Sequence, residues 1–558
     1  MRLYCAVLLK ALLIERGFLV ALPAQRRWYP IALFFAALVC LPISVLLLSW
    51  HSVDTQIWSH LWDTQMTRLI SNTAILIAGV GIGVTLLGVS LAWLTSLCEF
   101  PGRRWLDWAL MLPFAIPAYV LAFVFVGLLD FSGPVQTLMR EWFGSGMQFP
   151  RVRSTGGVIT VFTLVFYPYV YLLARTAFLA QGKGFMEAAR VLGLSPWQAF
   201  WRVALPVARP AIGAGVALAL MESLADFGAV SVFNFDTFTT AIYKTWYGFF
   251  SLSSATQLAS LLLLFVAVLL FAEQRARGAI RPSNERPRGK ALYILRGWRG
   301  VLAATWCGLV FLCAFVIPVL QLLAWFWQRG RFDLDERYTA LITHTLYLGL
   351  MAAALTVSAA LLLAFAKRMT ATRRMHALVG FANLGYALPG SVLAVAIMLA
   401  FSYLDEHAVI PLSTWLGGAG RPILLGSLSA LLLTYVIRFM AVAHGPLEGA
   451  LARIKPSLPE ASRSLGVSGI GLFRRVYLPL LLPGSLSAAL LVFVDVLKEM
   501  PATLLMRPFG WDTLAVRIFE MTSEGEWARA SLPALTLVAV GLLPVILLIR
   551  RSAYRPGH

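Results

Sequence analysis

The chain has 558 residues, of which 59% are hydrophobic and only 13% charged, against about 45–50% and about 25% in soluble domains. This composition excludes an ordinary water-soluble enzyme. The 46 Lys and Arg outnumber the 26 Asp and Glu, giving a net charge of +20. Nucleic-acid binding would need those charges clustered beside stacking aromatics. Because Trp and Phe lie mostly inside apolar stretches instead, we expect no nucleic-acid partner.

The order of apolar stretches predicts the fold. Residues 1–30 are interrupted by Lys10, Glu15 and several arginines, so they fit neither a signal peptide nor a span. Runs of about 20 apolar residues cross a bilayer only as helices. Twelve such stretches follow, near 31–50, 70–97, 105–129, 156–178, 210–232, 254–272, 300–328, 341–366, 378–404, 423–443, 481–507 and 528–549. The sequence predicts an all-α polytopic membrane protein with about 12 transmembrane helices.

The distribution of basic residues predicts which side of the membrane each loop faces. With the N-terminus in the cytoplasm, 33 of the 46 Lys and Arg fall on the cytoplasmic side, 12 on the outer side, and Lys498 within a span. Cytoplasmic loops are enriched in Lys and Arg in this way. We therefore expect both termini in the cytoplasm and read the excess charge mainly as an orientation signal.

The chain contains an internal repeat. A shift of 273 residues aligns EAARVLGLSPWQAFWRVALPVARP with EASRSLGVSGIGLFRRVYLPLLLP, with 12 of 24 positions identical. We infer two six-span halves with pseudo-symmetry. The expected organisation is a cytoplasmic lead (1–30), a first half (31–272), a basic cytoplasmic linker (273–299), a second half (300–550) and a cytoplasmic tail (551–558).

The repeated segment predicts a helical hairpin on the cytoplasmic face. Gly193 and Gly466 stand where a short helix would end in a left-handed cap. Ser195 or Ser468 can cap the second short helix. We expect that helix to stop at Pro206 or Pro479, before the next span. Such a hairpin suits the docking of a partner.

The motif Glu-Ala-Ala, three residues, Gly, nine residues, Val-x-Leu-Pro resembles the EAA loop of permeases in binding-protein-dependent ABC importers, and the chain carries it twice, with Ser462 replacing the last Ala of the second copy. The resemblance implies a fused permease with coupling helices in loops 183–206 and 456–479. It assigns ATPase coupling to Glu187, Ala188, Gly193, Pro206, Glu460, Ala461, Gly466 and Pro479.

The resemblance also implies partners and a place in the cell. Two copies of an ABC ATPase would bind the loops, using ATP and Mg on their own chains, and a periplasmic binding protein would deliver substrate. The expected location is the bacterial inner membrane, in contact with membrane lipid. The Gly-x4-Gly-Lys-Ser/Thr phosphate loop is missing from the sequence. We therefore expect a transport subunit without an ATPase of its own and without a bound cofactor.

Segments flanking the repeat resemble the fused permeases of ferric iron importers. They begin at Glu222 (ESLADFGAV), Asp236 (DTFTTAIY), Asp495 (DVLKEMPAT) and Arg507 (RPFGWDTLAVR). Thiamine and polyamine permeases share this architecture and remain alternatives. A secondary transporter driven by an ion gradient is the alternative of another class, since it can also have twelve spans in two halves.

Five charges fall in or near spans: Glu222, Asp226, Asp495, Lys498 and Glu499. Each acidic pair is spaced i, i+4, which places both members on one face of a helix, and the repeat relates the pairs. Intramembrane charges usually face a bundle interior or a wet cavity. Because hard cations prefer oxygen ligands, the sequence predicts a translocation path in which the four carboxylates contact a metal cation transiently. Ion pairing of Lys498 with a carboxylate is the structural alternative.

Two further patterns have mainly structural interpretations. Gly79, Gly81, Gly83 and Gly88 lie in one span and favour close helix packing over phosphate binding. Three tyrosines alternate in the fourth span, where packing or an interfacial position is the commoner role. They are Tyr167, Tyr169 and Tyr171.

Overall fold

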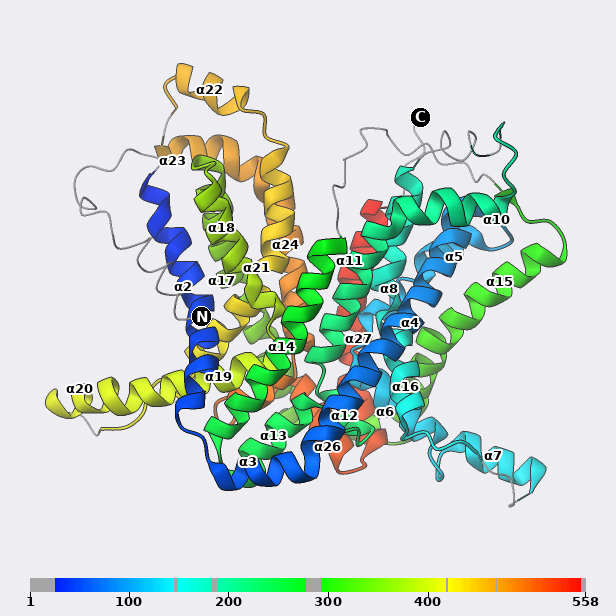
Figure 1. The fold of residues 1–558 in the computed structure, drawn as a ribbon, viewed down its shortest axis with the longest axis horizontal. Coiled ribbons are helices and arrows are strands. Elements are labelled where there is room, and N and C mark those ends of the chain that lie inside the picture. Colours follow the sequence, from blue (N-terminus) through cyan, green and yellow to red (C-terminus); the bar gives the residue numbers. More distant parts are fainter. Residues whose placement is uncertain are drawn as a thin grey trace.

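A computed structural model describes residues 26–144, 149–181, 189, 191–276, 293–417, 420–467 and 469–552. Nearly all of this part is helical, and the long helices run between two opposite ends of the molecule (Figure 1). The strands found there, β1 (Cys98–Glu99) and β2 (Tyr293–Ile294), have two residues each and pair in parallel. The prediction of an all-α fold is confirmed.

Twelve helical segments in the described residues are long and apolar enough to cross a membrane. This is the predicted number. They are Tyr29–His51, Thr55–Leu97, Ala118–Phe143, Thr155–Ala180, Trp197–Ala225, Leu252–Phe271, Trp298–Gln328, Glu336–Met369, Gly390–Trp415, Leu428–Ala452, Gly469–Lys498 and Trp527–Ile546.

The helices of the two repeats follow one another in the same order. The first repeat contains α2 (Tyr29–Leu48), α3 (Thr55–Leu61), α4 (Thr67–Leu97), α5 (Arg103–Ala109), α6 (Ala118–Leu129), α7 (Pro134–Phe143), α8 (Thr155–Ala180), α10 (Pro196–Ala199), α11 (Leu205–Ala225), α12 (Gly228–Val232), α13 (Phe238–Phe249) and α14 (Leu252–Ala276). The second contains α15 (Trp298–Phe311), α16 (Ile317–Gln328), α17 (Glu336–Met369), α18 (Arg373–Ala382), α19 (Gly390–Leu404), α20 (Ile410–Trp415), α21 (Leu428–Ala452), α22 (Ser457–Ser464), α23 (Gly469–Leu472), α24 (Leu478–Lys498), α25 (Pro501–Met506), α26 (Leu514–Ser523) and α27 (Trp527–Ser552).

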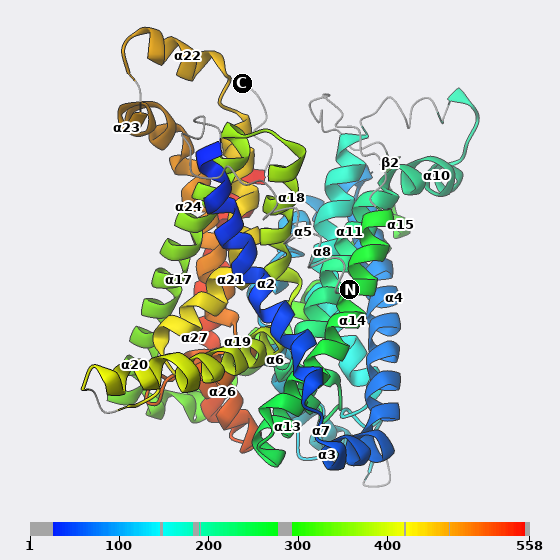
Figure 2. The same ribbon diagram turned by 60° about the vertical axis from the view of Figure 1, so that its left-hand side comes forward.

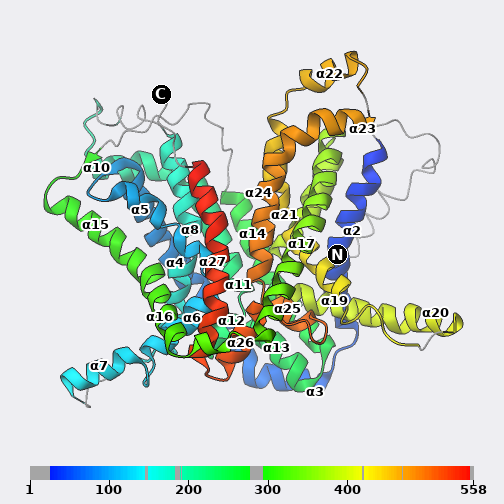
Figure 3. The same cartoon turned by 180° about the vertical axis from the view of Figure 1, so that it is seen from behind.

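The two ends of the molecule carry different elements. Helices α10, α22 and α23 lie at one end, which we call the α22 end, and α3, α13 and α26 lie at the other, the α3 end (Figures 1 and 3). Helix α2 begins and α27 finishes at the α22 end. Both described chain ends therefore lie on the side of the repeated loops.

The two repeats do not fold as separate bodies, because they exchange outer helices. Helix α2 of the first repeat packs on α17, α18 and α19 of the second, and α14 also packs on α19. In return, α16 contacts α6, and α27 packs against residues Leu112–Ala115 of the first repeat. Each of the two hydrophobic cores therefore contains side chains from both repeats.

Close packing of α4 against α8 depends on glycine. A Cβ added at Gly79, Gly83 or Gly88 would overlap side chains of α8, whereas Gly81 has more room. The predicted packing role is confirmed at three of the four glycines, which let the two backbones approach each other.

Four helices are interrupted in the middle of the molecule, where the sequence predicts continuous spans. Helices α6 and α19 begin only after Pro117 and Pro389, both in extended conformation. Helices α11 and α24 end at Ala225 and Lys498, and short helices α12 and α25 follow. The spans predicted at 105–129, 210–232, 378–404 and 481–507 are therefore broken, at equivalent places in the two repeats. Interrupted helices of this kind surround binding sites in many transporters.

Candidate functional site: the coupling loops and a charged central cavity

The second repeated loop forms the predicted helical turn. Helix α22 ends at Ser464, and Gly466, two residues later, has φ +78°. The Val467 N–H donates to the Ser462 carbonyl at 2.9 Å, and the Gly466 N–H donates to Arg463 at 2.9 Å. This pair of bonds is a Schellman cap, and its left-handed residue favours glycine.

The first loop repeats the same cap. Gly193 has φ +77°, and the Leu194 N–H donates to the Ala189 carbonyl at 3.0 Å. Ser195 then caps α10, because its Oγ accepts from the Gln198 N–H at 3.3 Å. The expected left-handed glycines and the Ser195 cap are confirmed, while Glu187, Ala188 and Ser468 lie outside the described residues.

The expectation that Pro206 and Pro479 stop the second short helix is wrong, while their assignment to ATPase coupling stays a prediction. Neither proline stops a short helix, since α10 and α23 continue through one π-helical turn each into the spans α11 and α24. In the first loop the Leu205 N–H donates to the Phe200 carbonyl, five residues back. A proline inside a helix lacks an N–H and crowds the preceding turn, and the wider π turn accommodates it.

Both loops expose apolar side chains at equivalent positions. Leu192 and Leu465 are 79% and 83% exposed, and Trp197 and Ile470 are also exposed. Helix α22, which carries Glu460 and Ala461, projects beyond the ends of the spans (Figures 1 and 3). Exposed apolar groups in matched positions are typical of a surface that binds another protein.

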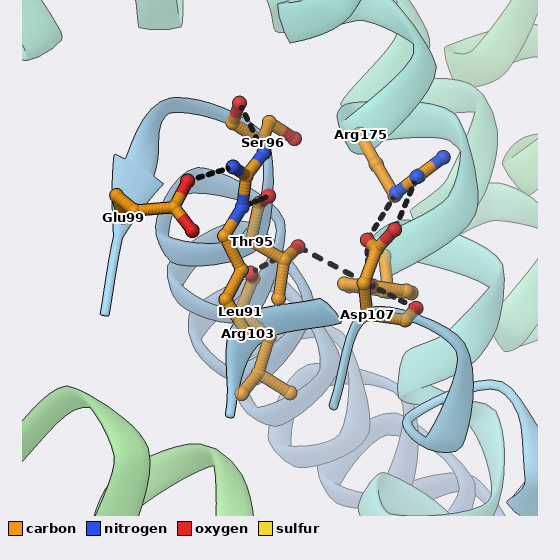
Figure 4. A network of polar contacts seen from close by, with 8 residues as sticks. Leu91, Thr95, Ser96, Glu99, Arg103, Asp107 and Arg175 are labelled. Atoms are coloured by element: carbon orange, nitrogen blue, oxygen red, sulfur yellow. Dashed lines mark hydrogen bonds and ion pairs between the residues drawn. The ribbon is translucent and has the colours of Figure 1, made fainter. Parts of the chain in front are cut away.

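The helix that leads into the first loop is anchored by ion pairs. Arg175, near the end of α8, donates from Nε and Nη2 to the two carboxylate oxygens of Asp107 at 2.6 Å each (Figure 4). Beside this pair, Arg103 donates to the Thr95 carbonyl at 2.7 Å and to Glu99 at 2.6 Å (Figure 4). Arg103 thereby satisfies carbonyl groups at the end of α4 that lack a helical partner.

The helix that leads into the second loop, α21, is also anchored by an ion pair, but here the loop-bearing helix supplies the acidic partner instead of the basic one. Lys367 at the end of α17 donates to Glu448 of α21 at 2.5 Å. Arg368 donates to the carbonyls of Leu451 and Ile454, where α21 ends. Both loops are thus connected to rigid helix ends, so a force applied to them would reach the spans.

The five intramembrane charges predicted from the sequence meet at one cavity of about 120 Å³. The interrupted helices of both repeats supply its wall. The residues that line it include Phe114, Pro117, Tyr119, Tyr169, Glu222, Asp226, Tyr386, Arg438, Asp495, Lys498 and Glu499.

Two of the four carboxylates act as helix caps. Asp226 follows the end of α11, and its Oδ1 accepts from the Ala229 N–H of α12 at 2.8 Å. Glu499 follows α24 in the same way, and its Oε1 accepts from the Ala502 N–H of α25 at 3.1 Å. Both residues have extended backbones, so the expectation that each acidic pair shares one helical face is wrong. The helices end before the second member of each pair.

The other two carboxylates lie on the last turns of α11 and α24. Glu222 accepts a hydrogen bond of 2.8 Å from the Tyr386 hydroxyl of the other repeat. Asp495, its repeat equivalent, lies in the electrostatic field of Lys498. The Lys498 ammonium donates to the Phe114 carbonyl at 2.7 Å.

Sequence reasoning missed several polar members of this wall. The sequence count included Arg438 among the 33 basic residues on the cytoplasmic side. In the structure Arg438 is buried in α21 and pairs with Glu499 at 3.1 Å. The position of Arg438 inside the apolar stretch 423–443 is the sequence signal that could have indicated a buried charge. Tyr386 and Tyr119 were also missed, and the buried Tyr119 hydroxyl has no hydrogen-bond partner in the structure.

The three alternating tyrosines of α8 divide between two roles. Tyr169 lines the cavity. Tyr167 and Tyr171 donate to the backbone carbonyls of Leu110 and Asp107 at 2.8 Å each, so the packing interpretation holds for them.

The cavity is not arranged as a metal cage in this conformation. Among the described residues, no three His, Cys, Asp or Glu side chains are grouped to hold a metal ion. Transient contact of a passing cation with Glu222, Asp226, Asp495 and Glu499 stays a prediction.

Comparison with known proteins identifies the fold. The family described as "Binding-protein-dependent transport system inner membrane component" matches residues 84–276 and again 356–554. The chain belongs to this family. The two matches cover both repeats, so the chain is a fused permease of a binding-protein-dependent ABC importer and a multi-pass membrane protein. It is the transport subunit of such an importer.

Three similar proteins show the range of substrates in this permease family. The chain is 28% identical to the Fe(3+)-transport system permease protein FbpB 2 of Haemophilus influenzae over 91% of this chain and 95% of that protein. It is 24% identical to the ferric transport system permease protein FbpB of Actinobacillus pleuropneumoniae, over 93% of this chain and 76% of that one. The sulfate transport system permease protein CysT of Escherichia coli is 30% identical, over 36% of this chain and 70% of its own.

Proposed function

We propose that this permease imports ferric iron delivered by a periplasmic binding protein. The observation that carries the proposal is the similarity to a permease named for Fe(3+) transport, which extends over 91% of this chain and 95% of that one. The similarity to the sulfate permease covers one repeat-sized segment only. Family membership also removes the ion-gradient-driven alternative, since these permeases belong to ABC importers.

The charges of the cavity support a cation as substrate. Its wall holds four carboxylates, Glu222, Asp226, Asp495 and Glu499, against Arg438 and Lys498. Arg438 is already paired with Glu499. A negative excess in a low-dielectric wall concentrates cations and repels oxyanions such as sulfate. Hard cations also prefer the oxygen ligands available here.

Within this wall, Glu222 and Asp495 are the best candidates for direct contact with the cation. Asp226 and Glu499 accept backbone N–H groups of α12 and α25, so these two would mainly hold the interrupted helices in place. Glu222 and Asp495 come from different repeats, so a cation between them would bind both halves. The Tyr169 and Tyr386 hydroxyls lie on the same wall and add oxygen atoms.

The coupling loops would receive two copies of an ATPase subunit. The apolar side chains exposed on both loops, Leu192 and Trp197 in one and Leu465 and Ile470 in the other, give each copy an equivalent contact. ATP and Mg would bind to those partners. Closure of the ATPase dimer would move the loops together, and the anchored helices α8 and α21 would transmit the motion to the cavity. In this proposal the α22 end and both termini would face the cytoplasm, and the excess of basic residues on that side supports this orientation.

Reconstitution in vesicles tests the proposal. The permease, its ATPase and its binding protein should support ATP-dependent uptake of radioactive ferric iron, and vanadate should block it. Excess sulfate, thiamine or spermidine should leave iron uptake unchanged. Uptake of thiamine or a polyamine in place of iron would overturn the iron assignment and favour those alternatives.

A further inference from the structure

Two helical arms leave the body at equivalent places in the two repeats. Helix α7 follows α6, and α20 follows α19. They extend sideways from opposite flanks of the molecule, nearer to the α3 end than to the α22 end (Figures 1 and 3), and Figure 2 shows α20 clear of the other helices. A shift of 273 residues relates Trp142 of α7 to Trp415 of α20.

Both arms lie mostly outside the hydrophobic cores, and of their residues only Val135 at the base of α7 packs against one of them. No residue of α7 or of α20 is buried, and the tryptophans are 76% and 81% exposed. In a water-soluble protein, so much exposed apolar surface would need a protein partner. Here the molecule spans a membrane, so arms that extend sideways beyond its flanks enter the surrounding lipid.

The α7 sequence is that of an interfacial helix. Its apolar side chains lie at positions i, i+3, i+4, i+7 and i+8, which form one face, and its polar side chains form the other. The apolar set is Val135, Leu138, Met139, Trp142 and Phe143, and the polar set is Gln136, Thr137, Arg140 and Glu141. Trp and Arg at the margins of an apolar face are typical of helices at the level of lipid headgroups.

The second arm repeats the pattern in a shorter helix. Leu412, Trp415 and Leu416 follow the spacing of three and four residues, and all three are exposed. Ser413 and Thr414 provide polar positions between them. The two arms thus share an exposed tryptophan near the tip and an adjacent large apolar residue, although the rest of their sequences differs.

Each arm is fixed where it joins the body. Asp405, buried at the start of the π-helical turn Asp405–Val409 that precedes α20, accepts from the N–H groups of Ile423, Leu424 and Leu425 at 3.1, 3.0 and 2.8 Å. In the first repeat, Arg140 donates to the Phe131 carbonyl at 2.8 Å, and its guanidinium lies 4.2 Å from the centre of the Phe131 ring. Rigid bases hold the arms in their lateral direction.

We propose that α7 and α20 are a pair of membrane-surface anchors that lie among the phospholipid headgroups of the leaflet at the α3 end, with their tryptophans inserted at the boundary with the acyl chains. The helices they extend begin near the cavity. Pro117 and Ala118 at the start of α6 line it, and Gly390 at the start of α19 lies against Glu499 and Arg438 of its wall. The anchors therefore fix one end of α6 and α19 relative to the membrane, while the other ends lie at the cavity.

Photocrosslinking tests the anchors directly. Trp142 or Trp415 is replaced, one at a time, by benzoylphenylalanine in the full-length permease, which is placed in nanodiscs of phosphatidylethanolamine and phosphatidylglycerol. Because neither side chain belongs to a core, the substitutions remove no buried contact. Leu86, exposed on α4, is the control inside the bilayer, and Phe509, fully exposed in the loop before α26, is the control in water.

We expect phospholipid adducts at both arms after irradiation, attached near the glycerol, and adducts farther along the acyl chains at position 86. Position 509 should give none. Absence of phospholipid adducts at both arms would overturn the proposal, as would attachment at the same depth as position 86. A crosslink from both arms to an added periplasmic binding protein would identify them as protein-docking elements and would also overturn it.

Discussion

The Tyr386 hydroxyl donates a hydrogen bond of 2.8 Å to Oε1 of Glu222, and this bond joins the second repeat to the first at the cavity wall. The position related to Tyr386 by a shift of 272 residues is Phe114. Its backbone carbonyl accepts a second bond between the repeats at this wall, from Lys498 at 2.7 Å. Equivalent positions thus connect the halves in two different ways, so the cavity is only approximately symmetric.

Tyr386→Phe removes the first of these connections together with the side-chain hydrogen bond between Tyr386 and Tyr169. A hydrogen bond to a charged group contributes about 1.5–3 kcal/mol, so we expect slower iron uptake with an assembled complex. Uptake by reconstituted vesicles measures the effect. Tyr435→Phe is the matched control, because its 2.6 Å bond to Thr503 lies within one repeat. Equal losses in the two variants would contradict a special role for the Tyr386 bond.

The carboxylates should separate into two functional classes. Glu222→Gln combined with Asp495→Asn should abolish iron uptake while the melting temperature stays near that of the wild type. Asp226→Asn removes a charged cap instead, and loss of a cap costs about 1 kcal/mol. We expect that variant to melt earlier and to keep part of its uptake. Thermal unfolding and uptake are measured on the same preparations.

Unchanged uptake in the Glu222 and Asp495 double variant, with ATPase and binding protein still associated, would refute the proposed path. Complete loss of uptake in Asp226→Asn without a change in melting would show that the division between caps and path residues is wrong.

We predict that Arg438 stabilises the folded permease by pairing with the buried carboxylate of Glu499. Arg438→Met leaves a buried carboxylate unpaired, which costs about 3–5 kcal/mol. We expect a large fall in the melting temperature of the purified permease. Adding Glu499→Gln should recover much of it, because the uncompensated charge is then removed. A double variant as unstable as Arg438→Met alone would show that Arg438 contributes through packing.

The left-handed glycines of the coupling loops should be required for ATPase docking. Gly193→Val and Gly466→Val place a β-branched side chain at φ +77° and +78°, a strain of about 1–3 kcal/mol. Steric overlap with neighbouring residues does not contribute to this strain, since nothing lies within 4 Å of a Cβ at either site. We expect weaker copurification of the ATPase and slower uptake.

Gly445→Val is the control for these loop variants, because this exposed glycine of α21 also has open space but lies within a helix. The substitution Gly466→Asp, which adds charge as well as strain, should have at least as large an effect as Gly466→Val. Normal copurification by a variant with both glycines replaced would refute the docking role of the loops.

Much of this architecture follows from the sequence by itself. Apolar runs of about 20 residues determine helices in a bilayer, because each run must satisfy its own backbone hydrogen bonds. The 273-residue repeat determines the pseudo-symmetry, and the glycine spacing determines the caps at Gly193 and Gly466. These features depend on local sequence, so they can be read without the fold.

Tertiary structure alone decided how the charges are used. Asp226 and Glu499 appear in the sequence as partners of Glu222 and Asp495 on continuous helices, yet the helices end first and both become caps. Arg438 reaches Glu499 from another helix, 61 positions earlier in the chain. Hydropathy cannot detect a short break in an apolar run, and it cannot tell which distant helix supplies the neighbouring charge. Those outcomes depend on packing between the two repeats, which exchange their outer helices around a shared cavity.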